Sequence, residues 1–97
     1  MPLDADLLQN FARKYVWWKK PEEAAAQPDR IVAQVMNIGD YDDVQSLVHQ
    51  AGLPYLREVL VHAEAGQFDA RSWTYWHYRL GVSDPGEVPA LPHRRLA

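Results

Sequence analysis

The stretch Pro28-Asp29-Arg30-Ile31-Val32-Ala33-Gln34-Val35-Met36-Asn37-Ile38-Gly39 decides the fold of this 97-residue chain. Proline is favoured at the first position of a helix, where its missing N–H is not needed, and glycine is favoured just past the last position. Between these two residues, apolar side chains recur at the spacing of one helical face: Ile31, Val32, Val35 and Ile38. The stretch therefore predicts a helix that begins at Pro28 and is closed by Gly39 in the left-handed conformation.

Two further helices are expected on the N-terminal side. Asp4 or Asp6 can cap the first of them, which ends before Pro21. Its buried stripe is predicted to comprise Leu7, Leu8, Phe11, Tyr15 and Trp18. Pro21 at a first helical position, followed by two carboxylates that favour the positive end of the helix dipole, predicts a short second helix through Ala26.

Three more helices are expected after Gly39. Asp40 caps the fourth, which Gly52 ends, and Pro54 opens the fifth, which ends near Gly66. Their predicted buried residues are Val44, Leu47, Val48 and Ala51, and then Leu56, Val59, Leu60 and Ala63. In the sixth, Asp69 is the N-cap, Phe68 packs on Trp73 as a hydrophobic staple, and Gly81 follows the last residue. Trp73, Trp76, His77 and Leu80 share its inward face.

Short loops between short helices predict an all-α fold, a compact orthogonal bundle of five to six short helices with an irregular C-terminal tail. The apolar fraction of 47% and the charged fraction of 24% are those of an ordinary globular chain. Residues 1–81 are expected to form a single helical domain. Residues 82–97 form a proline-rich tail that is either flexible or extended across the domain or a partner.

Composition and the N-terminus point to the cytoplasm. The chain has no cysteine, so disulfides and thiolate chemistry are excluded. Met1 to Asn10 carries Asp4 and Asp6 where an export signal would place positive charge and then an apolar run. Apolar runs are only a few residues long, far below the roughly 20 residues that span a bilayer. We therefore expect a cytoplasmic protein with no membrane partner.

The distribution of charge disfavours nucleic acid as the main partner. The net charge is −3, and the segment 40–66 has Arg57 as its only Lys or Arg. The same segment holds five carboxylates: Asp40, Asp42, Asp43, Glu58 and Glu64. Binding to phosphates needs several cations on one face.

No motif for catalysis or metal binding is present. The four histidines, His49, His62, His77 and His93, lack the helical spacing of metal ligands. The carboxylates Asp40, Asp42 and Asp43 are explained as a helix start, and there is no phosphate-binding loop or nucleophile motif. We therefore expect no enzymatic activity, no metal and no cofactor.

Aromatic residues are concentrated in the segments 15–18 and 73–78. On the sixth predicted helix, the arc opposite the core holds Arg71, Tyr75, Tyr78 and Arg79, where a solvated helix usually carries Lys, Glu and Gln. Tyr and Arg are enriched in protein interfaces. These four residues, with help from Tyr15 or Trp17, are the predicted protein-binding site; homo-oligomerisation also remains open.

Two other functions are compatible with the sequence. The segment Val44 to Val59 partly matches a helix-turn-helix, which would make the fourth and fifth helices a DNA-binding element with Arg57 among its contacts. The other alternative is a small-ligand binder or enzyme built around His77 and the neighbouring tryptophans. A core histidine bonded to backbone is the simpler interpretation of His77.

Three stretches together carry a resemblance: Arg13-Lys14-Tyr15-Val16-Trp17-Trp18, Pro28 to Gly39, and Arg71-Ser72-Trp73-Thr74-Tyr75-Trp76-His77-Tyr78-Arg79-Leu80-Gly81. They resemble a family of small bacterial helical proteins of uncharacterised function, often encoded beside nucleotidyltransferase toxins of the abortive-infection type. The resemblance covers roughly Phe11 to Gly81. It implies an antitoxin-like partner of such a toxin and carries over no catalytic residue.

Overall fold

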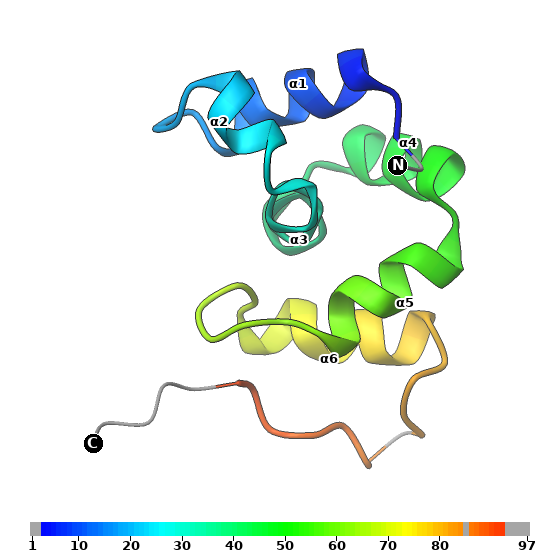
Figure 1. Ribbon diagram of the computed structural model, residues 1–97. Coiled ribbons are helices and arrows are strands. Elements are labelled where there is room, and N and C mark those ends of the chain that lie inside the picture. The colour runs from blue at the N-terminus through cyan, green and yellow to red at the C-terminus, as the bar shows by residue number, and fades with distance from the viewer. Residues whose placement is uncertain (1–2, 85, 93–97) are drawn as a thin grey trace, which may run out of the picture.

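The computed structural model describes residues 3–84 and 86–92, and over these residues it contains six α-helices and no strand (Figure 1). The helices are α1 (Ala5–Tyr15), α2 (Pro21–Ala25), α3 (Pro28–Ile38), α4 (Tyr41–Ala51), α5 (Leu53–Val61) and α6 (Ala70–Arg79). The all-α fold class predicted from the sequence is confirmed. None of these helices is long and apolar enough to cross a membrane, within the part of the chain described.

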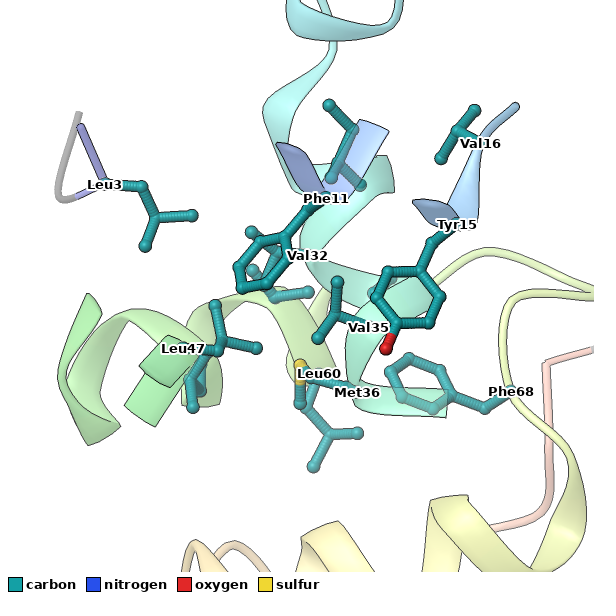
Figure 2. Close-up of a cluster of buried hydrophobic side chains, with 14 of the residues drawn as sticks. Leu3, Phe11, Tyr15, Val16, Val32, Val35, Met36, Leu47, Leu60 and Phe68 are labelled. Atoms are coloured by element: carbon teal, nitrogen blue, oxygen red, sulfur yellow. The ribbon is translucent and has the colours of Figure 1, made fainter. Parts of the chain in front are cut away.

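Helix α3 lies at the centre, and each of the other five helices packs against it. Figure 1 shows α1 and α2 on one side of α3, with α5 and α6 on the other. The side chains of Ile31, Val32, Ala33, Val35 and Met36 are buried. Figure 2 shows Phe11 from α1, Leu47 from α4 and Leu60 from α5 pointing toward this helix. The apolar periodicity of one segment thus organises the whole core.

Three aspartates cap helices: Asp40 and Asp69 as predicted, and Asp4 of the two candidates that the sequence offered for the first helix. The side chain of Asp4 accepts a hydrogen bond from the amide of Leu7 at the start of α1, at 2.7 Å. Asp40 caps α4 and Asp69 caps α6 in the same manner, each at 2.8 Å. Such a cap satisfies one of the amides that a helix start leaves without an intrahelical partner.

Helix α6 is attached to the C-terminal end of α3 by hydrogen bonds. The last carbonyls of a helix have no intrahelical donor. The indole Nε1 of Trp76 donates to the carbonyl of Met36 at 2.8 Å, and the Ser72 hydroxyl donates to the carbonyl of Asn37 at 2.9 Å. The Asp69 amide donates to the side-chain oxygen of Asn37 at 3.0 Å. Residues of α6 therefore supply donors that the end of α3 lacks.

The end of α6 has the predicted glycine closure. Gly81 is in the left-handed conformation, with φ of 65°, and the amide of Val82 donates to the carbonyl of His77 at 3.1 Å. The guanidinium of Arg57 in α5 donates to the carbonyl of Leu80 at 3.1 Å. At the other end, the Phe68 ring packs against Trp73 with centroids 5.8 Å apart, which confirms the staple.

The tail lies along the domain in residues 82–84 and 86–92. The indole Nε1 of Trp73 donates to the carbonyl of Pro89 at 2.7 Å. Val82, Val88 and Leu91 pack against the core as partly buried side chains. Of the alternatives that the sequence left open, the described part of the tail follows the one extended across the domain. The rest of the predicted tail, residues 85 and 93–97, lies outside the described residues.

Some predicted helix lengths and some predicted buried positions are wrong. Helix α1 ends at Tyr15, and Trp18, predicted on its buried stripe, is exposed. Lys20 is extended because proline disfavours the helical conformation in the residue before it, so the chain turns between the two helices. Helix α5 ends at Val61, short of Gly66. Ile38, predicted on the apolar face of α3, is exposed.

The prediction that Gly39 is left-handed is also wrong, because its φ is −62° and its ψ is 146°. Glycine is needed here for space. A Cβ at this position would lie 2.4 Å from the carbonyl oxygen of Val35 and 3.1 Å from the Cγ2 of Val44. The last turn of α3, and then the approach of Val44 from α4, therefore require glycine here, and no positive φ is involved.

We expect Gly39→Ala to lower the free energy of unfolding by about 1 to 3 kcal/mol, the usual cost of overpacking. Gly39→Asn should cost at least as much, because its larger side chain meets the same atoms. Gly66 is the matched control: its φ is 84° and it has open space, so Gly66→Asn should cost less than Gly66→Ala, since Asn tolerates the left-handed region. Urea unfolding of the four variants measures this, and a Gly39→Asn variant more stable than Gly39→Ala would contradict it.

A polar network joins the end of α1 to the start of α4. The Tyr15 hydroxyl donates to Asp43 at 2.5 Å and accepts from the amide of Asp40 at 3.1 Å. The ammonium of Lys14 lies 2.6 Å from Asp40 and 2.8 Å from Asp43. The hydrogen bond from Lys14 holds the pKa of Asp40 below its ordinary value. Because Lys14 is exposed, its salt bridges add little to the stability of the fold, and the main effect of the network is to orient Tyr15.

Two tyrosines have raised pKa values, from which we expect stability to fall at high pH. Burial, and then the hydrogen bond to Asp43, raises the pKa of Tyr15. Burial and the hydrogen bond to Asp29 likewise raise the pKa of Tyr55, on the opposite side of α3. A raised pKa means that the unfolded chain releases these protons first, so the stability is complete below about pH 10 and is lost as the pH rises further.

We expect the urea midpoint to be constant from about pH 8 to about pH 9.5 and then to fall up to about pH 11.5. In the double variant Tyr15→Phe, Tyr55→Phe the midpoint should be lower at neutral pH, because both hydrogen bonds are lost, but its fall above pH 10 should be shallower. Tyr75→Phe, at an exposed tyrosine, serves as the control and should keep the slope of the native chain. An unchanged slope in the double variant would assign the alkaline loss to other groups.

Candidate protein-binding site

Helix α6 has one buried face and one exposed face. Trp73, Trp76 and His77 are buried, and Trp76 is only 1% exposed. The predicted binding residues Arg71, Tyr75 and Tyr78 are exposed, and Arg79 is half-buried between the faces. The helix covers α3 with its tryptophans, so its Tyr and Arg arc faces solvent.

Two residues of the arc, Tyr75 and Arg79, line a recess of about 260 Å³, here called the Tyr75 groove, while Arg71 and Tyr78 are outside its lining. It lies where the end of α3, the start of α4 and the exposed side of α6 meet. Its lining is Met36, Asn37, Gly39, Tyr41, Val44, Gln45, Ser72, Tyr75, Trp76 and Arg79. Because Ser72 and Trp76 also bond to the last carbonyls of α3, the groove is formed by the same contacts that attach α6 to the core.

Arg79 is held over the aromatic rings of the groove. Its guanidinium lies 5.3 Å from the centroid of the Trp76 ring and 5.9 Å from that of Tyr75. One guanidinium nitrogen donates to the Tyr75 hydroxyl at 2.9 Å. Cation–π contact of this kind orients the side chain without using most of its donors.

The Tyr75 groove carries positive charge. Arg79 is the only Lys, Arg, Asp or Glu in its lining, and Arg71 lies two turns earlier on the same face. Neither arginine forms a salt bridge with another residue of the described ranges. A carboxylate from outside the chain would find free donors here.

Of the groove residues that the sequence did not place in the binding site, Tyr41 is the exposed aromatic one. It is the first residue of α4 and is 77% exposed. A role in binding is not evident from the sequence because Tyr41 directly follows the Asp40 cap, and the segment is explained entirely as the start of a helix. A large aromatic residue on the polar side of that start is the signal that could have found it.

The structure does not bring Tyr15 and Trp17 to this site. Tyr15 is 5% exposed, and its hydroxyl is bonded to Asp43 and Asp40, so its place in the predicted binding site is wrong. Figure 1 shows α1 on the side of α3 away from α6. Trp17 is 74% exposed but follows the end of α1, outside the lining of the Tyr75 groove.

The two alternative sites gain no support. Arg57, the single basic side chain of the expected DNA-reading helix, donates to the carbonyl of Leu80 and is held against the domain. His77 is buried, bonds to the carbonyl of Trp73 at 2.7 Å and packs edge-on against the Trp73 ring. That is the core histidine expected from the sequence. His77 lines neither the Tyr75 groove nor the two recesses beside Gln27 and Glu64, and no group of metal-ligating residues occurs in the described ranges.

Comparison of the chain with protein-family models, with curated proteins and with solved structures finds no match. The function is therefore argued from the geometry of the site, since a helical bundle hosts many unrelated activities.

Substitutions on the buried and on the exposed face of α6 should differ in their effect on thermal unfolding. Trp76→Ala is expected to cost about 3 to 5 kcal/mol, because it removes a buried indole together with its hydrogen bond to Met36. Tyr75→Ala and Arg79→Ala should each cost no more than about 0.5 to 1 kcal/mol, since exposed contacts contribute little. If either exposed variant unfolds as early as Trp76→Ala, the arc belongs to the core.

Proposed function

We propose that this chain is a non-catalytic protein-binding module, and that its Tyr75 groove receives a segment of another protein. The observation that carries the proposal is an exposed Tyr and Arg arc of which Tyr75 and Arg79 line a preformed recess. Tyrosine and arginine combine a large contact area with polar ends, and they recur among the residues that dominate binding energies. The groove floor is Trp76, which is fixed to α3 and loses little freedom on binding.

The lining defines the partner segment by its chemistry. Met36, Val44 and the Trp76 ring offer an apolar floor, so one apolar side chain of the partner would enter the recess. The free donors of Arg79, which lines the recess, favour a carboxylate beside that side chain. Tyr41 and Tyr75 are exposed residues of the lining, and exposed polar groups of this kind suit an interface edge.

For the identity of the partner, the resemblance of three segments to bacterial proteins encoded beside nucleotidyltransferase toxins favours a toxin of that type. The chain would then act as an antitoxin-like partner in the cytoplasm. The absence of cysteine agrees with a reducing compartment. The toxin partner and the cytoplasmic location are both parts of this proposal.

Co-expression of the chain with a nucleotidyltransferase-type protein encoded beside it should give a stable complex. The measurement is size-exclusion chromatography of the mixture at micromolar concentration. A single peak containing both proteins is the expected result. Separate elution of the two proteins would reject the toxin partner.

Substitutions in the Tyr75 groove should weaken this complex without unfolding the chain. Tyr75→Ala, Arg79→Ala and Tyr41→Ala are each expected to raise the dissociation constant by about tenfold or more, as interface anchors do. Trp17→Ala is the matched control, because it removes an exposed aromatic residue outside the groove. Titration calorimetry measures all four. Equal loss of affinity in Trp17→Ala, or none in the groove variants, would place the interface elsewhere.

A further inference from the structure

A second exposed aromatic feature lies in the turn between α1 and α2. Trp17 is the most exposed tryptophan, and its ring packs edge-on against Trp18 with centroids 5.8 Å apart. The backbone there is fixed by the amide of Lys19, which donates to the carbonyl of Val16 at 3.1 Å. Trp17 is thus a large apolar side chain held on a defined turn, and the Tyr75 groove makes no use of it.

A recess of about 260 Å³ lies directly beside this turn, here called the Trp18 recess. Apolar side chains of Val16, Trp18, Ala24 and Ile31 form part of its lining. Lys19, Gln27, Arg30, Gln34, Glu64, Ala65, Gly66 and Gln67 complete it. Trp17 is absent from the lining, so the exposed ring lies next to the recess rather than inside it.

Charges of both signs lie beside this turn. Lys19 and Lys20 precede Pro21, and Glu22 and Glu23 follow it in the first turn of α2. All four are exposed, and none forms a salt bridge within the described ranges. The corner therefore presents a projecting ring, a recess and unpaired charges of opposite sign within a few residues.

We propose that this corner is a symmetric interface between two copies of the chain, in which Trp17 of each copy enters the Trp18 recess of the other. A two-fold axis pairs a patch with itself, so the patch must contain both members of every contact. This corner contains both the Trp17 ring and the recess that would receive it. It also contains both the two lysines and the two glutamates that would pair with them. The pair Lys19 and Lys20 of one copy lies against Glu22 and Glu23 of the other.

The same features disfavour other occupants. A nucleic acid or an anionic membrane would be attracted by the lysines, but the two glutamates of the same turn would repel it. A copy of the chain satisfies both signs at once. The interface is also separate from the Tyr75 groove, so dimerisation and partner binding are independent properties of the molecule.

Sedimentation velocity from about 1 μM to about 1 mM tests the proposal over the range of weak dimers. The native chain should shift from monomer to dimer as its concentration rises. Trp17→Ala should raise the dimer dissociation constant by about tenfold or more, while Tyr75→Ala should leave it unchanged. A native chain that stays monomeric throughout, or a Trp17→Ala variant that dimerises equally well, would overturn the proposal.

A charge-reversal experiment tests the pairing itself. The variant Lys19→Glu, Lys20→Glu carries an all-acidic corner, and the variant Glu22→Lys, Glu23→Lys carries an all-basic one. Each should be monomeric alone, and an equimolar mixture should form the heterodimer. Circular dichroism melts check that both variants are folded, which matters because Glu22 and Glu23 also favour the start of α2. Folded variants that each still form dimers, or a mixture that does not associate, would rule out this pairing of charges.

Discussion

The hydrogen bond from the Trp76 indole to the carbonyl of Met36 is the contact on which most of the molecule depends. The last carbonyls of α3 lie in the interior, where an unpaired polar group is costly. Trp76 supplies a donor to one of them and fills the adjoining apolar space with its ring. This one side chain therefore both contributes to the core and helps to attach α6 to the central helix, together with the hydrogen bonds of Ser72 and Asp69.

This mode of attachment explains why α6 has an exposed aromatic face. Its two tryptophans face inward: Trp76 donates to the carbonyl of Met36 in α3, and Trp73 donates to the carbonyl of Pro89 in the tail. On the opposite arc Tyr75 and Tyr78 remain exposed, and Tyr75 borders the groove between α6 and the start of α4. The side chains that stabilise the helix are thus buried, while the tyrosine proposed to contact the partner is exposed at the edge of the same groove. Stability and binding can be changed separately, which is the condition for an interface on so small a domain.

The two aromatic segments of the chain serve two separate surfaces. The core lies between them, because α1 and α6 pack against different sides of α3 (Figure 1). Tyr15 illustrates the difference between composition and position: it belongs to an aromatic run, yet its ring is buried and its hydroxyl joins α1 to α4 through Asp43. Trp17, two residues later, is beyond the end of the helix and faces solvent.

The sequence alone determined the all-α class, the Asp40 and Asp69 caps, the buried face of α3 from Ile31 to Val35, the staple of Phe68 on Trp73 and the exposed arc of α6. These are local properties, set by side-chain spacing and by the groups that a helix end lacks. Only the tertiary structure decided that Gly39 is needed for space, that Tyr15 is internal and that Tyr41 joins α6 in a groove. Each of these depends on how closely two elements approach, and that distance follows from packing between residues remote in the chain.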